Sequence, residues 1–427
     1  MRRGLYTGLF YALAPLFWLG MWRRSRRVPG QWEVLGRARF GHPDGQTGAP
    51  GAVWVHAVSL GETRAAQPLV DALLARGLPV LLTHMTATGR AEGARLFAAA
   101  LARGQLRQAW LPYDFPGAVR RFLDTHAPAC GLIIEREIWP NLLAAARARG
   151  LPMALVSARF SAGSLRLSLR LGRVMREALA GLDRVLAQTG RDAVRLREGG
   201  AQAVQVTGNL KFDISLPPAL LAQGRAWRAA LGRPVVAIAS TREGEDALFA
   251  QAMRQRPGPR PLYLLIPRHP QRFESACEQV RDAGLRLARR SDSVAQDLAE
   301  VDVLVGDTLG EMAFYYAAAD VAIIGGSFAP LGGQNLIEAC VAGTPVITGP
   351  HTFNFEQATQ DAIAAGAAER VQNAEQALAL ADQWLADAAL LDQRARAALA
   401  WTADHAGAVE RSLDALQDWL GPLRPGV

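Results

Sequence analysis

The stretch Val53-Trp54-Val55-His56-Ala57-Val58-Ser59-Leu60-Gly61-Glu62-Thr63 joins a short apolar run, Ala52–Val58, to a polar turn and then to the Ala- and Leu-rich segment Thr63–Ala75. An apolar run of this length that ends in turn residues is typical of a buried strand, and the segment after it has the composition of a helix. The same alternation recurs through the first half of the chain. Further strands are predicted at Pro79–Thr83, Gly131–Ile134, Met153–Val156, Arg184–Ala187 and Ala203–Val206, and a further helix at Asn141–Arg149. Strands that alternate with helices indicate βαβ units and a parallel sheet.

A second series of the same kind follows the proline pair Pro217-Pro218. Its strands are predicted at Val235–Ala239, Leu262–Ile266, Val303–Val305, Val321–Ile324 and Pro345–Ile347. The last stretch, from about Asn373 to Leu420, has the pattern of helices. We therefore predict an α/β protein with two doubly wound, Rossmann-like domains in tandem that face a cleft. Residues 28–213 form the first domain in this prediction, and residues 214–427 form the second together with the terminal helices.

Composition and charge argue against two classes of function. The formal net charge is +8, but residues 1–27 contain six arginines and no acidic residue, which leaves +2 for the other 400 residues. A basic excess confined to one end gives little support to nucleic-acid binding, so we expect no nucleic-acid partner. The three cysteines, Cys130, Cys277 and Cys340, are widely spaced and fit neither a disulfide framework nor a zinc site. They indicate a reducing compartment for the body of the protein.

The N-terminus has the features of a membrane anchor. The run from Gly4 to Trp22 is uncharged and apolar, and as a helix it would be roughly 28 Å long, about one hydrocarbon core. The cluster Arg23-Arg24-Ser25-Arg26-Arg27 follows it, where a cleaved signal peptide would offer small residues. By the positive-inside rule the rest of the protein stays cytoplasmic. Pro15 leaves two arrangements open for residues 1–27, a spanning helix and a kinked helix that lies in the inner leaflet.

Two acidic motifs follow predicted strands in the first half, at the edge where ligands bind in open α/β sheets. Glu62 lies in a Gly-containing turn that opens a helix, so it either contacts a ligand or complements the helix dipole. In Glu135-Arg136-Glu137 two carboxylates flank an arginine directly after a strand. This motif is weak as a metal site because it lacks neighbouring histidines and a second acidic cluster, and no metal is predicted. One of the two glutamates could hold a cationic group, or the motif could be a solvated charged surface.

Glycine-rich turns recur at the ends of strands in the second half. The stretches that form them or adjoin them are Ile266-Pro267-Arg268-His269-Pro270, Gly306-Asp307-Thr308-Leu309-Gly310-Glu311-Met312, Gly325-Gly326-Ser327 and Gly332-Gly333-Gln334-Asn335-Leu336-Ile337-Glu338. Such turns at helix N-termini bind anions, and Arg268 adds positive charge for a phosphate. A glutamate one turn into such a helix can accept both hydroxyls of a ribose. These turns together predict a nucleotide site, although neither a phosphate-loop motif nor a GxGxxG motif is present.

A single lysine, Lys211, stands among 47 basic residues, in Gly208-Asn209-Leu210-Lys211-Phe212-Asp213. Arginine replaces lysine everywhere else, and the flanking residues predict a tight polar loop. A compact ammonium can enter a narrow pocket beside a phosphate or a carboxylate, where a planar guanidinium fits poorly. The alternative is that one codon escaped replacement. A second basic feature is Ser164–Arg176, where a single helix would place Arg166, Arg170 and Arg173 on one face, either to meet lipid headgroups or as a solvated surface.

Taken together, these motifs resemble the 3-deoxy-D-manno-octulosonic acid (Kdo) transferases of Gram-negative lipopolysaccharide assembly, from the N-terminal anchor to beyond His351–Phe355. The motifs that carry the resemblance are Val58-Ser59-Leu60-Gly61-Glu62-Thr63, Leu111-Pro112-Tyr113-Asp114, Glu135-Arg136-Glu137-Ile138-Trp139-Pro140-Asn141, Gly208-Asn209-Leu210-Lys211-Phe212-Asp213, Pro267-Arg268-His269-Pro270 and Gly306-Asp307-Thr308-Leu309-Gly310-Glu311.

The resemblance implies a GT-B glycosyltransferase that inverts configuration, needs no metal or other cofactor, and moves Kdo from CMP-Kdo to a lipid A precursor (lipid IVA). It also implies a place at the cell inner membrane and its phospholipid, with the first domain binding the acceptor and the second the CMP-sugar. Glu62 matches the general base, and Glu135 and Lys211 match positions that stabilise the transition state. The positions that match CMP-binding motifs are Arg268, His269, Gly310, Glu311, Met312, Asn335, Leu336, Ile337 and Glu338.

The sequence departs from the family pattern at Gln334, at Leu336-Ile337 and at Thr241-Arg242-Glu243, where the family often has His, Pro-Leu and Thr-His-Glu. These departures concern nucleotide contacts and leave Glu62 and Lys211 untouched. Two other functions stay open at this point. One is a GT-B transferase that uses a UDP-sugar on another lipid carrier. The other is a non-catalytic, membrane-anchored nucleotide sensor, in which Glu62 would be structural.

Overall fold

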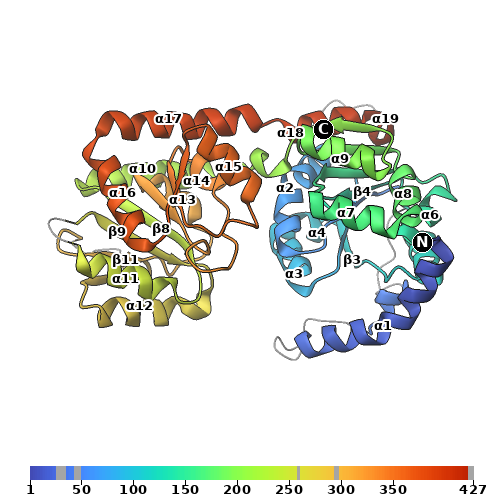
Figure 1. The fold of residues 1–427 in the computed structure, drawn as a ribbon, viewed down its shortest axis with the longest axis horizontal. Coiled ribbons are helices and arrows are strands. Elements are labelled where there is room, and N and C mark those ends of the chain that lie inside the picture. Colours follow the sequence, from blue (N-terminus) through green and yellow to red (C-terminus); the bar gives the residue numbers. More distant parts are fainter. Residues whose placement is uncertain (26–34, 43–49, 257–259, 293–297, 422–427) are drawn as a thin grey trace. The chain divides into compact units, whose positions relative to one another are not determined.

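The computed structural model describes residues 1–25, 35–42, 50–256, 260–292 and 298–421. Figure 1 labels many of its helices and strands, and the same labels are used below. Arg26 and Arg27 of the predicted basic cluster lie outside the described residues, as does the predicted domain start at residue 28. The chain divides into two compact units, of which the first contains Met1–Asp213 and Ala406–Val427 and the second contains Ile214–His405.

The first unit contains a seven-stranded parallel sheet with the order β3-β2-β1-β4-β5-β6-β7. Its strands are β1 (Val53–His56), β2 (Val80–His84), β3 (Leu106–Trp110), β4 (Cys130–Ile134), β5 (Met153–Ala158), β6 (Arg184–Ala187) and β7 (Val204–Val206). The six strands predicted in this half are confirmed within about two residues at each end, as is usual for strand boundaries. The sequence analysis missed β3, because Arg107 and Gln108 interrupt its apolar pattern at the sheet edge, where they are half-buried.

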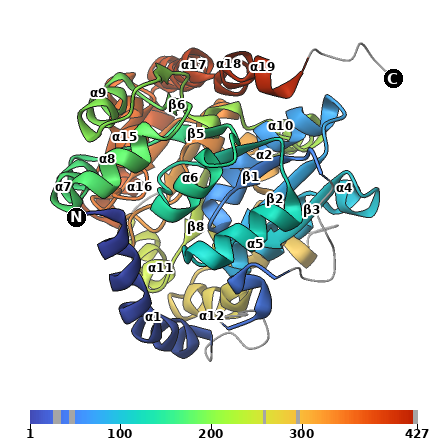
Figure 2. The same ribbon diagram turned by 90° about the vertical axis from the view of Figure 1, so that its right-hand side faces the viewer.

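Helices cover both faces of this first sheet. The helices of the unit are α1 (Arg3–Ser25), α2 (Leu60–Ala75), α3 (Ala87–Leu96), α4 (Ala98–Ala102), α5 (Pro116–His126), α6 (Pro140–Arg147), α7 (Ala162–Leu171), α8 (Arg173–Ala180), α9 (Gly190–Gly199), α18 (Ala408–Ala415) and α19 (Gln417–Leu420), with short 3-10 turns η1 (Arg37–Phe40) and η2 (Leu210–Asp213). On one face, Phe122 of α5 and Leu143 of α6 pack with Trp54 of β1, and Figure 2 shows both helices in front of the strands. On the other face, Leu69 of α2 packs with Val55 of β1. Alternate side chains of β1 therefore pack into hydrophobic cores on opposite faces of the sheet, because successive side chains of a strand point to opposite sides.

The second unit repeats this architecture with a seven-stranded parallel sheet of order β10-β11-β9-β8-β12-β13-β14. Its strands are β8 (Val235–Thr241), β9 (Leu262–Pro267), β10 (Leu287–Arg289), β11 (Val303–Val305), β12 (Val321–Ile324), β13 (Val346–Thr348) and β14 (Ala368–Arg370). Its helices are α10 (Pro218–Leu231), α11 (Glu245–Gln255), α12 (Phe273–Asp282), α13 (Met312–Ala317), α14 (Ile337–Val341), α15 (Glu356–Ala364), α16 (Ala374–Ala386) and α17 (Ala388–His405), with the turns η3 (Pro270–Arg272) and η4 (Arg290–Asp292). The two unpredicted strands, β10 and β14, are the two edges and have only three residues each.

Two expectations about organisation differ from the structure. The segment from Ala406 returns to the first unit, whereas the sequence analysis gave all of residues 214–427 to the second domain. The reason is apolar burial, because Leu413, Leu416 and Leu420 lie in the core beside α2. The single helix expected over Ser164–Arg176 is instead two helices, α7 and α8, because Gly172 has a φ of 67° and a ψ of −128°. Arg166 and Arg170 thus lie on one helix and Arg173 on the next.

Helix α1 is docked against the first unit along most of its length. Near its start, the Tyr6 hydroxyl donates to Asp114 Oδ2 at 3.0 Å and the Thr7 hydroxyl donates to Asn141 Oδ1 at 3.0 Å. Further along, the rings of Phe10 and Phe115 lie 5.1 Å apart. Trp18 lies against the same Phe115 ring and against two more, those of Phe40 and Tyr113. One face of this apolar helix is therefore part of a folded core, while the other is exposed.

Candidate active site

The strand order of the first sheet reverses between β1 and β4. These two strands are neighbours, although β2 and β3 lie between them in the sequence. Ligands of open α/β sheets bind at such a switch point, beyond the carboxyl ends of the strands. Glu62 follows β1 at the start of α2, and Glu135 follows β4 directly. The structure therefore brings two of the three predicted catalytic residues to the two strands that flank the switch point.

Glu62 lies in the first turn of α2, where its Oε2 accepts the Val58 N–H at 2.6 Å. The structural alternative of the sequence analysis therefore has support, since the carboxylate lies in the first turn of the helix and accepts a backbone N–H just before it. The helix dipole and this hydrogen bond would by themselves lower the pKa of a carboxyl group. Instead, burial and the nearby charges of Glu135 and Glu137 raise the pKa of Glu62 to about 8. A carboxyl group held near neutral pH in this way is suited to accept a proton.

Glu135 and Lys211 form a direct ion pair. Lys211 Nζ donates to Glu135 Oε1 at 2.6 Å, with 20 % of the lysine side chain and 8 % of the glutamate side chain exposed. The sequence analysis left the anion that faces Lys211 open between a phosphate and a carboxylate, and in this structure it is the Glu135 carboxylate. Glu135 also has a φ of 64°, which is unfavourable for a residue with a side chain. Strained backbone of this kind is concentrated at functional sites.

The loop that carries Lys211 is fixed at several points within the first unit. The Asn209 Oδ1 accepts the Lys211 N–H at 3.0 Å, and the Ser157 Oγ accepts the N–H of Leu210 at 3.3 Å. Ser157 is buried, has a φ of 52°, and accepts a second hydrogen bond from Gln188 Nε2 at 3.1 Å. The predicted tight polar loop is in fact one 3-10 turn, η2. Sequence reasoning missed Ser157 and Gln188. The apolar pattern at the end of β5 gives no sign that Ser157 has a left-handed backbone conformation.

Several predicted nucleotide-binding residues gather at the carboxyl ends of strands in the second unit. Arg268 and His269 follow β9, where the Arg268 N–H donates to Thr241 O at 3.0 Å. The charges of Arg268 and Glu338 both act on the pKa of buried Tyr316, which burial raises well above its ordinary value. The structure thus places a cation from the β9 end and a carboxylate from α14 around one tyrosine.

Asn335 and Glu338 are joined by a hydrogen bond from Asn335 Nδ2 to Glu338 Oε1 at 3.0 Å. Asn335 Oδ1 also accepts the N–H of Ile337 at 3.1 Å, which fixes the start of α14. The side chains of Leu336 and Ile337 are buried in the core of the unit, so any ligand contact from them would be made by the backbone.

The loop after β11 holds the third predicted cluster. Glu311 accepts hydrogen bonds from Arg290, at 3.0 Å from the terminal nitrogen, and from the Thr308 hydroxyl. These contacts lower its pKa, although burial acts against them. Gly310 has a φ of 84°, a conformation that favours glycine, and Met312 begins α13 as a half-buried residue. Glu311 is therefore an anion held in place by hydrogen bonds, directly after a glycine whose backbone conformation favours that residue.

The turn Gly325-Gly326-Ser327 does not offer an open anion site, contrary to the sequence expectation. The N–H groups of Gly326, Phe328 and Ala329 donate to the carboxylate of Glu245, at 2.6, 2.9 and 3.3 Å. A side chain of the protein already occupies the position that a phosphate would take. Sequence reasoning missed Glu245, although its place directly after Gly244 at a strand-to-helix turn was visible.

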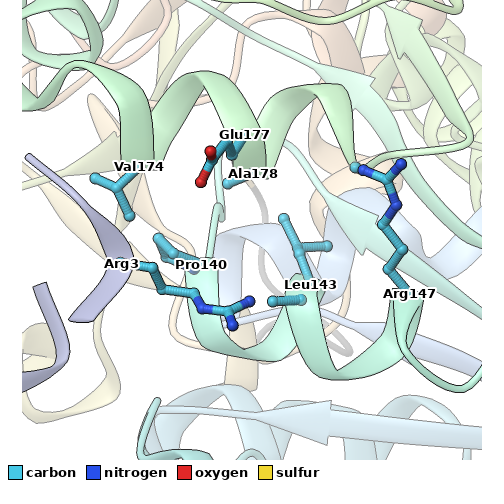
Figure 3. A pocket seen from close by; sticks show the side chains of 9 residues that line it. Arg3, Pro140, Leu143, Arg147, Val174, Glu177 and Ala178 are labelled. Carbon is cyan, nitrogen blue, oxygen red and sulfur yellow. The ribbon is translucent and has the colours of Figure 1, made fainter.

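Within the described parts of the chain, no group of three or more His, Cys, Asp or Glu side chains is arranged to hold a metal ion. A hollow of about 270 Å³ lies between α6, α8 and the first turn of α1. Figure 3 shows Arg3, Arg147 and Glu177 around it, so its charge is mixed. None of the predicted catalytic residues lines this hollow. Its lining includes Arg3, so it lies where α1 packs against α6 and α8.

Comparisons with known proteins agree with this architecture. The family model "3-Deoxy-D-manno-octulosonic-acid transferase (kdotransferase)" matches residues 36–214. A 3-deoxy-D-manno-octulosonic acid transferase of Bordetella pertussis is 67% identical over 99% of this chain and 100% of its own length. One of Haemophilus influenzae is 28% identical over 98% and 99% of the two chains. The crystal structure of a glycosyltransferase from Rickettsia africae matches with a TM-score of 0.56 and 12% identity, over 87% of this chain and 99% of that one, which confirms the GT-B fold. The chain therefore belongs to the 3-deoxy-D-manno-octulosonic acid (Kdo) transferase family of glycosyltransferases.

Proposed function

We propose that the protein transfers Kdo from CMP-Kdo to a lipid A precursor, lipid IVA, with inversion at the anomeric carbon and without a metal ion. The similarity to the Bordetella pertussis transferase over the whole chain supports the reaction. The observation that carries the assignment of chemistry is the position of Glu62, a half-buried carboxyl group with a pKa of about 8 at the switch point of the first sheet.

In the proposed reaction, the Glu62 carboxylate takes the proton from a hydroxyl group of the acceptor. The hydroxyl oxygen attacks the anomeric carbon of Kdo on the face opposite the leaving group. The new C–O bond forms while the bond to the CMP phosphate breaks, and the electron pair leaves with the phosphate oxygen. A single displacement of this kind inverts the configuration, and a positioned base contributes roughly 10²–10⁴-fold to its rate.

Lys211 is assigned to charge stabilisation in this proposal. Its ammonium is held by Glu135 at the same strand edge as Glu62, so the cation needs no reorientation while negative charge develops on the leaving phosphate. In the second unit, Arg268 provides positive charge for the nucleotide, and Glu338 and Glu311 are carboxylates suited to the hydroxyls of the ribose. Asn335 holds Glu338 for this role.

We further propose that the protein is attached to the cytoplasmic face of the inner membrane and that α1 lies along the surface rather than across the bilayer. Within the described residues, Arg3–Arg23 is the one helical stretch long and apolar enough to cross a membrane. A spanning helix would have to give up the hydrogen bonds of Tyr6 and Thr7 and the aromatic contacts of Phe10 and Trp18. Large apolar side chains of α1 are exposed, namely Leu5, Leu9, Leu13, Leu16, Leu19 and Trp22, and beside them Tyr11 and Phe17, whose rings also contact Phe115 and Tyr113. An apolar face of this size, on a helix docked by its other face, suits the interfacial region of a bilayer.

Mass spectrometry of the product from CMP-Kdo and tetra-acylated lipid A precursor tests the reaction. We expect the acceptor mass to increase by one or more Kdo residues, in the presence of excess chelator as well as without it. Transfer from a UDP-sugar in preference to CMP-Kdo would support the other transferase. Nucleotide binding without any product would support a sensor, and a rate that Mg²⁺ restores after chelation would contradict metal independence.

A further inference from the structure

Glu245 is a buried carboxylate that joins two strand ends of the second unit. Its side chain is fully buried, and it lies at the first position of α11, directly after Gly244 in the short turn that follows β8. Oε2 accepts the N–H groups of Arg242 at 2.8 Å and Gly326 at 2.6 Å. Oε1 accepts those of Phe328 and Ala329. One carboxylate thus satisfies four backbone donors, three of which belong to the turn after β12.

The strands that Glu245 joins flank the switch point of the second sheet. Strands β8 and β12 are neighbours in the sheet, while β9, β10 and β11 lie between them in sequence. A burial this complete is costly for a carboxylate unless donors compensate it, and four N–H groups supply that compensation. Glycine at position 325 allows the two backbones to lie this close, because a Cβ there would lie only 2.7 Å from Thr241 Cα.

The turn that Glu245 holds is connected to the predicted donor-binding residues. The Gly333 N–H donates to Gly326 O at 2.7 Å, which ties the second glycine-rich turn to the first. Asn335 and Glu338 follow Gly333 within five residues. Ser327 connects the same turn to the end of β13, since its hydroxyl accepts the Gly349 N–H at 2.8 Å.

We propose that Glu245 is a positioning residue for the donor, a built-in anion that fixes the glycine-rich turn Gly325–Ala329 and, through Gly326 and Gly333, the segment that carries Asn335 and Glu338. This inference rests on the proposed CMP-Kdo site. Glu245 acts through the backbone and touches no reacting atom. The glycine-rich turn is consequently a scaffold whose amide groups face inward, and the phosphate of the nucleotide is left to side chains such as Arg268.

The variant Glu245→Gln separates this role from general support of the fold. Whichever oxygen becomes an amide nitrogen, two backbone N–H groups lose their acceptor and face a second donor. A matched control is Asp320→Asn, because Asp320 Oδ2 accepts the Val235 N–H at 2.8 Å and also joins β8 to β12, but at the amino ends of these strands. Both variants are expected to lower the melting temperature.

Calorimetric titration with CMP then distinguishes the two positions. We expect Glu245→Gln to bind CMP about 10-fold or more weakly, since an unpaired buried donor disturbs the turn by an amount of this order, while Asp320→Asn stays close to wild type. In steady-state kinetics, the KM for CMP-Kdo should rise while the KM for the lipid acceptor stays the same. Equal CMP affinity in Glu245→Gln and wild type would overturn the inference, as would an equal loss of affinity in Asp320→Asn.

Amide hydrogen exchange gives a readout that does not depend on the identity of the ligand. In Glu245→Gln the amides of Gly326, Phe328 and Ala329 should exchange faster, while those in the middle of β8 and β12 stay protected. Unchanged exchange in the turn would contradict the inference. If Glu245→Gln does not fold, Glu245→Asp replaces it, since the shorter carboxylate cannot reach all four donors and should also weaken CMP binding. A wild-type protein that fails to bind CMP would refute the proposed function and with it the donor-positioning role, and the exchange experiment would still decide whether Glu245 fixes the turn.

Discussion

Lys211 Nζ lies 2.6 Å from Glu135 Oε1, although the two residues are 76 positions apart in the chain. The pair joins the end of β4 to the turn after β7, and its glutamate lies near enough to Glu62 to raise the pKa of that carboxyl group. One carboxylate therefore has two effects, because it fixes a cation and keeps a neighbouring carboxyl group basic. The single lysine of the chain thus lies where its side chain is only one-fifth exposed and its ammonium meets a buried carboxylate.

Replacing Lys211 tests whether a compact ammonium is required. Lys211→Arg should reduce turnover at least ~10-fold, or about 1.4 kcal/mol of transition-state stabilisation, because a planar guanidinium is larger and directs its donors differently. Lys211→Ala should cost more, since the charge itself is lost. Steady-state rates of both variants, compared with their melting temperatures, provide the measurement. An arginine variant that turns over at the wild-type rate would make the single lysine an accident of codon usage.

Much of this arrangement could be predicted from the sequence, because it depends on local patterns. Short apolar runs between helical segments predict parallel strands, and carboxyl ends of parallel strands share one edge. That logic placed Glu62 and Glu135 at the same edge of the sheet, and the structure adds that their strands, β1 and β4, are neighbours. The same pattern did not predict the edge strands β3, β10 and β14, because a short or half-exposed strand need not be apolar throughout.

The features that sequence could not supply depend on contacts between distant segments. The Glu245 carboxylate and the amides of Gly326 and Phe328 are more than 80 residues apart, so the turn looked like an open anion site. Helix α18 belongs to the first unit because Leu413 and Leu416 pack into the hydrophobic core beside α2, a contact between distant segments of the chain. Helix α1 resembled a free anchor because its composition does not show that Tyr6 and Thr7 bind Asp114 and Asn141.

Two buried histidines should make the first unit less stable in mild acid. Burial lowers the pKa of His56 to about 3 and that of His84 to about 4, whereas both titrate near 6.5 in an unfolded chain. As the pH falls below 6.5, the two histidines bind protons in the unfolded state but stay neutral in the folded state. The free energy of unfolding therefore decreases towards pH 4, by up to about 1.4 kcal/mol per pH unit for each histidine.

The variant His84→Gln isolates this effect, since Asp114, whose pKa is raised to about 6, acts in the opposite direction in both proteins. Denaturant unfolding at pH 7 and pH 5 should show a smaller loss of stability in His84→Gln than in wild type. An equal loss in the two proteins would mean that His84 is not buried in its neutral form.

The exposed face of α1 should control membrane binding. Removal of residues 1–27 would also uncover Phe115 and Tyr113, so substitutions on the exposed face separate membrane binding from folding. Leu9→Gln combined with Leu16→Gln should shift the protein out of the membrane fraction in vesicle sedimentation, because two apolar side chains leave the interface. The double variant Leu248→Gln and Leu399→Gln, at exposed positions in the second unit, serves as the control. Equal retention of all three proteins would assign membrane binding to another surface, such as that of Arg166 and Arg170.

The raised pKa of Glu62 predicts how rate and stability depend on pH. The value of kcat/KM should increase with pH up to about 8, as the carboxyl group loses its proton and becomes a base. Stability should change in the opposite direction. Between about pH 4.5 and 8 the folded state keeps a proton that the unfolded state has lost, so the contribution of Glu62 to stability is present below this range and is lost as the pH rises through it.

Glu62→Gln cannot lose that proton, and the variant should therefore be more stable than wild type at pH 9 and closer to it at pH 5. Thermal unfolding at the two pH values measures the difference. A variant less stable than wild type at pH 9 would indicate that the bond to the Val58 N–H outweighs the cost of burying the charge.

The turnover of Glu62→Gln with saturating CMP-Kdo and lipid acceptor, measured beside its affinity for CMP, is the most direct test of the proposed active site. The amide keeps the shape of the side chain but cannot accept a proton, so turnover should fall at least ~10²-fold while CMP binds as tightly as in wild type. Turnover within a few-fold of wild type would contradict the account, because the base would then have to be another residue.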